Sequence, residues 1–524
     1  MSTARASTRL AALLSALALS QPALGQPASP VGHWRLETSD AQGRPSGGVV
    51  TIEADPAGGL RYERRTRAEL QDPARVERGV ARLEQGRLVT EAAATPGVAG
   101  ALSGAGASGA TGRYELRAGA WEGQRAGVAE RLVPLAGDAR NEVRLLVDGE
   151  AFVVLREALR AAQRSIDLQM FQWADDPTGR SIGELLMERA RAGVRVRVLL
   201  DGRSGFINRA VKEDAVDASE RLLDELRAAG AAVIHQHRFG DALRGTLRDG
   251  RSFFADALTR VRGGTPPERE TRRFLVHDHR KVIVIDRRVG FMGGQNLAEH
   301  YERSWHDVQA RVEGPAVHDM EALFLDRWSA AGGQGTLEPA LAEAWTGDVP
   351  VEVLGSVPGL PDPIKARLLD EVRGARREVL GAFAFIDDDE SLGAFMQAAR
   401  GGVRTVLVIP GDEEQVNWLV RDAFLAVQNE VVRSGVELYK LRGRMLHAKV
   451  AVFDERLAAL GSHNLGAGKM AESELLIPDP RFAREMKRRL WEVDLPHCER
   501  VQVRALRFME QLRSRGARLL RAIL

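Results

Sequence analysis

The chain has 524 residues, and its 74 lysines and arginines against 72 aspartates and glutamates give a formal net charge of only +2. That balance lacks the strongly basic footprint expected of a protein that binds nucleic acid through its phosphates. The length is enough for about three domains with substantial cores, and the single cysteine, Cys498, excludes an intrachain disulfide.

The amino-terminal residues have the three-part pattern of an export signal. Arg5 and Arg9 precede an apolar run at 10–19, and a small-residue site ends at Gly25. The run is too short to span a bilayer as a helix. We therefore expect residues 1–25 to be a signal peptide and the protein to be periplasmic or secreted; an uncleaved anchor or a disordered leader is the alternative. Without the two arginines the basic count is 72, equal to the acidic count.

Residues 30–135 are predicted to form a β-rich domain. Segments such as 33–37, 49–53 and 60–64 alternate apolar with polar residues between Gly, Pro and Asp, which is typical of a small antiparallel sheet or barrel. A stretch rich in Gly, Ala and Ser at 97–112 is predicted to be a loop. No motif that could carry chemistry lies here, so we expect this domain to brace the catalytic part; binding of a partner, lipid or wall component is the alternative.

From residue 140 the pattern changes to strands that alternate with helices, and it occurs twice. The pattern predicts an α/β fold of two βα halves, 140–335 and 346–524, each a mixed sheet flanked by helices. The predicted strands lie at 143–147, 166–171, 194–200, 351–354, 379–385 and 403–409, and the predicted helices at 151–164, 182–192, 363–377 and 390–399. Segment 203–273 is longer than its counterpart, 411–446, and is predicted to be an insertion.

One motif, His-x-Lys-x4-Asp, occurs once in each half, and its two copies are separated by a constant 168 residues. Five positions keep that offset, which indicates an internal duplication rather than chance. The matched positions are His279 and His447, Lys281 and Lys449, Asp286 and Asp454, Gly293 and Gly461, and Asn296 and Asn464.

These residue types suit transfer of a phosphoryl group. One histidine can attack phosphorus while the other protonates the leaving oxygen. The two lysines and the two asparagine amides can stabilise the added negative charge of a pentavalent phosphorus without a metal or another cofactor. The motif aspartates follow strand-like runs, so we expect them to hold the backbone first and to serve catalysis second.

Each motif histidine also needs an acceptor that fixes its tautomer. Two acidic residues lie at similar distances downstream: Asp307 is 28 residues after His279, and Glu474 is 27 residues after His447. We predict that these carboxylates orient the histidines, with Glu472 as a rival to Glu474.

The paired motifs resemble those of the phospholipase D superfamily, specifically its bacterial cardiolipin synthase-like branch, and the resemblance covers residues 140–524. It implies a pseudo-dimer with one active site between the halves and a covalent phosphohistidine. By resemblance His279 is the nucleophile and His447 the general acid, while Asn296, Asn464, Asp307 and Glu474 match supporting positions. Ser462 stands where the first copy has Gly294, and the segment after Asn464 departs from the family's usual tail, so headgroup and acceptor stay open.

We therefore expect a metal-independent phosphodiesterase or phosphatidyltransferase that acts on glycerophospholipids. It should require no cofactor and should work as a monomer with an intrachain pseudo-dimer. A nuclease is the enzymatic alternative, disfavoured by the neutral charge, so no nucleic acid is favoured as partner. A degenerate lipid-binding homologue is the other alternative, disfavoured because both motifs are intact.

Three further features are weighed against plainer interpretations. His235, His237 and His277 lack accompanying carboxylates or cysteines at a recognised ligand spacing, so no metal site is expected. The tail at 500–521 holds seven arginines, with apolar residues at near-helical spacing. It is either a basic amphipathic helix on an anionic membrane surface or a terminal helix packed on the core. Trp305 can line the substrate site or simply pack.

Overall fold

The structure is a computed structural model, and it divides into two compact units that are described separately. The predicted signal peptide, most of the glycine-rich stretch, His237 and most of 203–273 lie outside the described residues. The described residues are 32–39, 45–54, 60–66, 75–84, 87–92, 111–117, 120–125, 128–134, 140–201, 220–236, 277–343, 345–358, 360–466 and 470–521.

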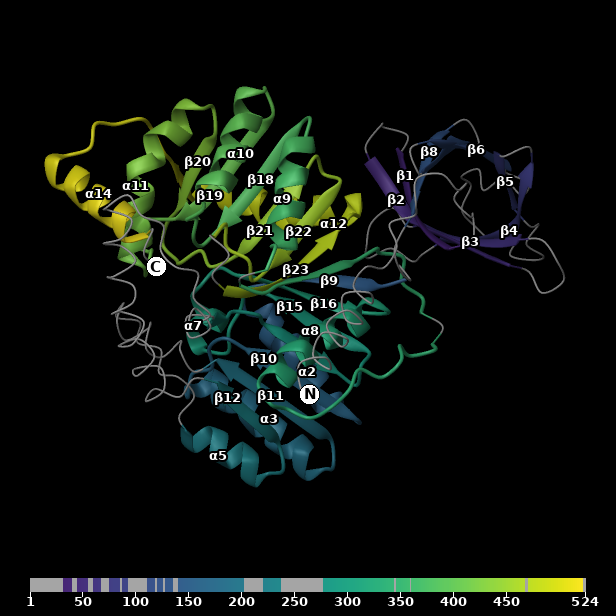
Figure 1. Cartoon of the computed structure of the whole chain (residues 1–524), viewed down its shortest axis with the longest axis horizontal. Coiled ribbons are helices and arrows are strands. Elements are labelled where there is room, and N and C mark those ends of the chain that lie inside the picture. The colour runs from purple at the N-terminus through teal and green to yellow at the C-terminus, as the bar shows by residue number, and fades with distance from the viewer. Residues whose placement is uncertain are drawn as a thin grey trace, which may run out of the picture. The chain divides into compact units, whose positions relative to one another are not determined.

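The first unit is a closed antiparallel barrel of eight strands (Figure 1). Apolar side chains that alternate along the strands, including Trp34, Leu36, Ile52 and Leu88, fill its interior, as the period-2 pattern predicts. The β-rich fold expected for this region is therefore confirmed. Its strands are β1 (Gly32–Ser39), β2 (Pro45–Ala54), β3 (Leu60–Thr66), β4 (Arg75–Glu84), β5 (Arg87–Ala92), β6 (Thr111–Arg117), β7 (Ala120–Arg125) and β8 (Val128–Pro134).

The second unit begins with a seven-stranded mixed sheet in the order β12-β11-β10-β14-β15-β16-β9. Alternate residues of its strands face opposite sides, so Ile283 and Ile285 pack against one layer of helices while Val282 and Val284 face the other half of the molecule. The elements are β9 (Glu142–Val147), α2 (Glu150–Ala161), β10 (Ser165–Met170), α3 (Pro177–Arg191), β11 (Arg195–Asp201), α5 (Glu220–Ala228), β12 (Ala232–Gln236), β14 (Val282–Ile285), β15 (Val289–Gly293), α7 (Glu299–Arg303), β16 (Val308–Glu313) and α8 (Ala316–Ala330).

A second mixed sheet repeats that topology as β20-β19-β18-β21-β22-β23, with β17 paired to β23. Segment 203–273 was predicted to be only an insertion, but α5 and β12 within it are the counterparts of α11 and β20. The elements are β17 (Glu352–Ser356), α9 (Pro363–Gly374), β18 (Glu378–Phe383), α10 (Asp389–Arg400), β19 (Arg404–Pro410), α11 (Trp418–Arg433), β20 (Glu437–Leu441), β21 (Lys449–Phe453), β22 (Leu457–Gly461), β23 (Met470–Ile477), α12 (Pro480–Arg489), α13 (Trp491–Asp494), η2 (Leu495–His497), β24 (Cys498–Arg500) and α14 (Phe508–Arg521).

The two halves share one hydrophobic core. Residues from both sheets, such as Leu145, Met292, Leu380 and Leu460, belong to a single buried cluster, together with side chains of α8 and α12. The helices α2, α3 and α5 pack on the far face of the first sheet, and α9, α10 and α11 on the far face of the second (Figure 1). This arrangement confirms the predicted pseudo-dimer.

A short piece of the first half pairs with the sheet of the second. Strand β13 (His277–Asp278) runs parallel to β23, with Asp278 opposite Ala471. In the reverse direction, His306 bridges to Leu446, just ahead of β21. These two exchanges of backbone hydrogen bonds place both copies of the motif where the halves meet.

Candidate active site

Each motif histidine is tied by its backbone to the opposite half. The N–H of His279 donates to the carbonyl of Ala471 at 2.9 Å, and the N–H of His447 donates to the carbonyl of His306 at 2.7 Å. Both imidazoles are only 5% exposed. The two sequence copies, 168 residues apart, therefore meet at a single junction.

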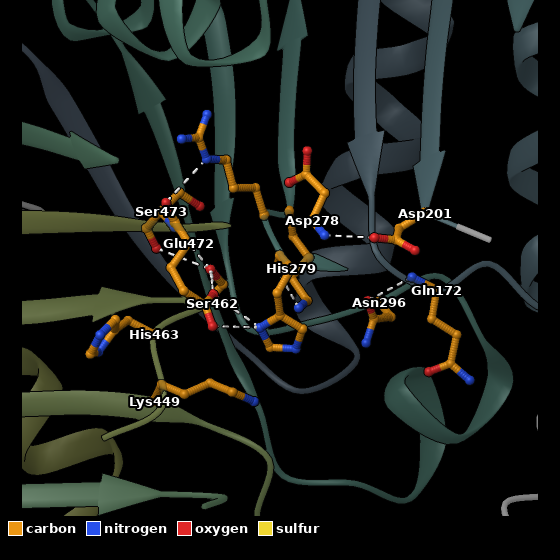
Figure 2. Close-up of polar contacts among 12 residues, drawn as sticks. Gln172, Asp201, Asp278, His279, Asn296, Lys449, Ser462, His463, Glu472 and Ser473 are labelled. Carbon is orange, nitrogen blue, oxygen red and sulfur yellow. Dashed lines mark hydrogen bonds and ion pairs between the residues drawn. The ribbon is translucent and has the colours of Figure 1, made fainter. Parts of the chain in front are cut away.

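The carboxylates that hold the imidazoles are also exchanged between the halves. Nδ1 of His279 lies 3.0 and 3.1 Å from the two carboxylate oxygens of Glu472 (Figure 2). Nδ1 of His447 lies 2.6 Å from Oδ2 of Asp307. With an acceptor at Nδ1, each ring carries its proton there and presents Nε2 to a substrate. Each half thus supplies one histidine and the acceptor for the other half's histidine.

The prediction that Glu474 orients a histidine is wrong, and the register of the strands explains why. Gly294 donates its N–H to the carbonyl of Val308, and Ser462 donates its N–H to that of Ser473. The residue before each of these carbonyls is an acid, so Glu472 corresponds to Asp307, and two residues further Glu474 corresponds to Gln309. The second half is three residues shorter between motif and acid, which distance counting did not allow for.

Glu474 instead lies against β22. A Cβ added to Gly461 would come within 2.2 Å of Oε2 of Glu474, so glycine is needed at that position. Burial, and next the charge of Glu472, raise the pKa of Glu474 well above its ordinary value. The surroundings of Glu474 therefore favour the neutral form of its carboxyl.

Both motif lysines lie inside the cluster. Nζ of Lys281 donates to the carbonyl of His279 at 2.7 Å, and Nζ of Lys449 donates to the carbonyl of His447 at 2.5 Å. Nζ of Lys449 also lies 2.9 and 3.1 Å from the two ring nitrogens of His447, and Figure 2 shows its side chain extending toward His279. The two lysine amines and the two imidazoles thus belong to one buried cluster.

Burial dominates the electrostatics of this cluster. It lowers the pKa of His279 to about 4, against the opposing charge of Glu472, and it lowers the pKa of His447 well below its ordinary value, with Lys449 acting in the same direction. Burial likewise lowers the pKa of Lys449 to about 8 and raises that of Asp307 to about 6. Both imidazoles are therefore neutral at neutral pH.

The carboxyl of Glu472 behaves differently from that of Asp307. Burial alone would raise the pKa of Glu472, but His279 and Lys281 outweigh it and hold that pKa below the ordinary value. The hydroxyl of Ser462 donates to Oε2 of Glu472 at 2.5 Å. In the first half Gly294 takes the place of that serine, and a Cβ there would come within 2.2 Å of Oδ1 of Asp307.

The two motif asparagines are not equivalent either. Asn296 accepts from the backbone N–H of Gln172 at 3.1 Å (Figure 2). It also donates to the hydroxyl of Tyr301 at 2.7 Å, so it is engaged within the first half. Asn464 is 4% exposed, and within the described part of the chain neither end of its amide has a hydrogen-bond partner. Of the two amides predicted to bind substrate, that of Asn464 is the one left open.

The motif aspartates stand away from the histidines and hold backbone. Asp286 accepts from the N–H groups of 163–165 at 2.6 to 2.9 Å, ahead of β10. Asp454 accepts from the N–H groups of 376–378 at 2.8 to 3.3 Å, ahead of β18. Both carboxylates therefore fix the start of a central strand, as expected first for them, and a part in catalysis stays a prediction.

Aromatic rings enclose the two histidines. Phe171 meets His279 edge-on at 4.7 Å between ring centres, while Tyr301 and Trp305 lie 5.0 and 5.4 Å from His447. Trp305 thus packs against a motif histidine. His463, in contrast, contacts Asp362 at 3.3 Å and points away from His279 (Figure 2).

Three further features concern metal binding, membrane-spanning helices and the carboxyl-terminal tail. Among the described residues no cluster of three or more His, Cys, Asp and Glu could hold a metal ion. No helix within the described ranges is long and apolar enough to cross a membrane. The tail forms α14, which packs against α11 and leaves Phe508, Met509 and Leu512 more than half exposed.

Comparison with known proteins agrees with this geometry. A family model described as cardiolipin synthase, PLD-like domain, matches residues 368–493. Cardiolipin synthase B of Escherichia coli (strain K12) is 28% identical over 385 residues, which cover 69% of this chain and 82% of the relative. Cardiolipin synthase A of Pseudomonas fluorescens (strain SBW25) is 28% identical over 404 residues, covering 74% and 76%.

A solved structure shares the fold. The crystal structure of phosphatidylserine synthase from Haemophilus influenzae Rd KW20 aligns with a TM-score of 0.53 and 14% identity, covering 73% of this chain and 95% of that one. The paired sheets and the crossed histidine sites agree with the pseudo-dimer that the resemblance to phospholipase D-type enzymes implies. The chain is therefore similar to cardiolipin synthases of the phospholipase D type, both in sequence and through the family model that matches its second half.

Proposed function

We propose that the protein is an exported phosphatidyltransferase that acts on glycerophospholipids through a phosphohistidine. The crossed pair of imidazoles carries this proposal, because each has its Nδ1 bound to a carboxylate of the opposite half and the lysine of each motif contacts its own histidine. The names of the cardiolipin synthases to which the chain is similar support the substrate class.

The reaction would run in two displacements. Nε2 of His279 attacks phosphorus, the bond to the leaving oxygen breaks, and that oxygen takes a proton from Nε2 of His447. In the second displacement His447 removes the proton of an acceptor hydroxyl, whose oxygen attacks phosphorus and releases His279. Glu472 stabilises the positive charge that His279 acquires, because it is the ionised partner of that ring.

The protonated form of His447 depends on the substrate. Burial, and next the charges of Lys449 and Lys281, oppose a positive charge on His447. A bound phosphodiester anion would offset those lysines, and the raised pKa of Asp307, about 6, helps the hydrogen-bonded pair of Asp307 and His447 to take up a second proton from solvent, so that Nε2 of His447 also carries an N–H. Lys281, Lys449 and Asn464 would then bind the non-bridging oxygens.

The decisive experiment is product analysis by mass spectrometry. The protein is incubated with phosphatidylglycerol vesicles in excess chelator, beside the variants His279→Asn and His447→Asn. We expect cardiolipin and glycerol from the unmodified protein and a severe loss of both in the variants. Phosphatidic acid instead of cardiolipin would make the enzyme a hydrolase. A product that forms equally in the variants, or none at all, would overturn the proposal and make single-stranded DNA the next substrate to test.

A further inference from the structure

A buried ion cluster that the mechanism does not use lies directly behind His447. The ring of His306 is 2% exposed, and a carboxylate faces each of its nitrogens: Oδ1 of Asp148 at 2.8 Å from Nδ1, and Oδ2 of Asp494 at 2.9 Å from Nε2. Arg444 donates to Oδ2 of Asp148 at 2.7 Å and lies 3.6 Å from Asp494. Two cations and two anions therefore balance within the cluster.

The arrangement of acceptors fixes the charge of the ring. A neutral imidazole has one N–H and one lone pair, so it could donate to only one of two carboxylates. With Asp148 also paired to Arg444, both ring nitrogens of His306 must donate, and the ring is an imidazolium. Burial alone would lower the pKa of His306, but the hydrogen bonds to Asp148 and Asp494 outweigh it and raise the pKa to about 9.

This cluster is joined to the catalytic pair by short backbone contacts. Asp148 accepts from the N–H of Asp307 at 3.1 Å through Oδ1, and its own N–H donates to the carbonyl of Asp307 at 2.9 Å. The carbonyl of His306 accepts the N–H of His447 at 2.7 Å. The peptide that carries Asp307 is thus fixed to both halves through His306 and its two carboxylates.

The pseudo-symmetric position in the other half is filled by a different cation. Arg280 is 1% exposed and donates to the carbonyls of Glu472 at 3.1 Å, Ser356 at 2.9 Å and Leu323 at 3.1 Å. Strand register makes Ser356 the counterpart of Asp148. A buried cation therefore stabilises the contact between the two halves next to each motif histidine. It is the guanidinium of Arg280 near His279 and the imidazolium of His306 near His447.

We propose that His306 is a positioning residue for the reaction, an imidazolium clamped between the two halves that sets Asp307 against His447. Its effect is confined to the proton-donating histidine, whereas Arg280 serves the attacking one. This inference rests on the proposed function, in which His447 protonates the leaving oxygen. Positioning matters at this scale because displacement of a catalytic group by about 1 Å can cost on the order of 10²-fold in rate.

The test compares two phosphatidyl esters that differ only in the leaving group: phosphatidylglycerol, and phosphatidyl-p-nitrophenol, whose phenolate leaves without a proton. The first release of alcohol or phenol is timed with enzyme in excess, so that only the first displacement is measured. For His306→Gln we expect a loss of about 10- to 100-fold with phosphatidylglycerol and of less than about threefold with the nitrophenyl ester, since general acid catalysis is needed only for the first.

Two variants serve as controls. His447→Asn should show the same dependence on the leaving group, more strongly, and Arg280→Gln should slow both esters alike because it acts behind the nucleophile. An equal loss with both esters in His306→Gln, or no loss, would overturn the inference. If His447→Asn itself ignores the leaving group, the assigned general acid is wrong, and the proposed function fails rather than the role of His306.

A milder change covers the case in which His306→Gln does not fold. Asp494→Asn keeps the imidazolium and removes one of its carboxylates, so it should lower the rate selectively with phosphatidylglycerol by a smaller factor. The double variant, His306→Gln with Asp494→Asn, pairs two neutral amides and should recover several-fold over His306→Gln alone. A failure of Asp494→Asn to discriminate between the esters would contradict the clamp.

Discussion

The two halves of the catalytic unit carry the same motif, yet they surround it differently. Behind His279 the brace is Arg280, and the acceptor is Glu472, which receives a second hydrogen bond from Ser462. Behind His447 the brace is His306, and the acceptor is Asp307, which has no such hydroxyl. One histidine thus rests on a carboxylate kept ionised, and the other on a carboxylate whose pKa is raised to about 6.

That difference suits two different tasks. A nucleophile must accept positive charge when it binds phosphorus, which an ionised Glu472 stabilises. A group that gives and takes protons is helped by a partner whose pKa lies near the working pH. In the proposed mechanism, residues outside the two matching motifs would therefore divide the roles of the two histidines.

Replacing the two motif histidines separately tests that division, and it should produce the largest effects. His279→Asn should abolish turnover, by more than about 10³-fold, and acid quenching should trap no phosphohistidine. His447→Asn should still form the phosphohistidine with phosphatidyl-p-nitrophenol and accumulate it, because no base remains to activate the acceptor hydroxyl. Mass spectrometry of the quenched protein measures both; a phosphoryl group found on His447 would reverse the assignment.

Replacing Glu472, one of the two glutamates of β23, should give the next largest loss of activity, whereas replacing Glu474 should give little. Glu472→Gln removes the charge that supports His279 and should lower kcat by about 10²-fold or more. Glu474→Gln replaces a carboxyl whose neutral form is favoured by burial with a neutral amide of similar shape, so we expect less than about a threefold change. Steady-state kinetics on phosphatidylglycerol measures both, with thermal unfolding as a check on folding. A greater loss in Glu474→Gln would contradict the strand register on which the correction of that residue rests.

Alkaline pH should weaken the stabilising contribution of His306 but not that of Arg280, since only the imidazolium can lose its proton. The pKa of His306 is raised from 6.5 to about 9, so its contribution to stability is complete below about pH 6.5 and is lost as pH rises through about 9. The contribution is on the order of 3 kcal/mol. Lys449 acts oppositely, because its lowered pKa of about 8 favours the folded state as pH rises.

The difference in stability between the unmodified protein and His306→Gln separates the titration of His306 from that of the other groups. Urea unfolding midpoints of the unmodified protein and of His306→Gln should converge as pH rises from 7 to 10. The groups that face the ring are Asp148, Asp494, Arg444 and Asp307, with Cys498 beyond Asp494, where burial raises the thiol pKa to about 12. A constant difference across that range would show that the ring carries no extra proton in the folded state.

The sequence predicted the fold and the motif residues of the site better than it predicted which carboxylate contacts which histidine. Period-2 and helical patterns placed both halves, because hydrophobic burial on a given face leaves a local signature. The constant offset of 168 residues identified the histidines, lysines and asparagines. Exchange of carboxylates between the halves has no such signature, since it depends on two sheets packing face to face. The three-residue contraction after Asn464 also hid the equivalence of Asp307 and Glu472.

His306 illustrates the same limit. Next to Trp305 and Asp307 it could be noticed in the sequence, but Asp148 and Asp494 lie 158 and 188 residues away along the chain. A charge cluster assembled from such distant segments leaves no spacing to recognise. In contrast, the backbone role of Asp286 and Asp454 followed from their place at strand ends, where local geometry decides.

The smallest loss of activity should follow from Ser462→Gly, which replaces the serine beside Glu472 with the glycine that the first half has beside Asp307. Ser462→Gly makes the second half resemble the first and removes one hydrogen bond to a charged carboxylate, of about 1.5 to 3 kcal/mol. Because Glu472 keeps its contact with His279, we expect only about a two- to tenfold loss in kcat/KM, with the acid limb of its pH profile displaced upward as the pKa of Glu472 rises. The reciprocal Gly294→Ser is the matched control: its Cβ would lie 2.2 Å from Oδ1 of Asp307, so it must displace that carboxylate and lose more activity. If the two exchanges cost the same, the asymmetry between the acids would not be what divides the roles of the histidines.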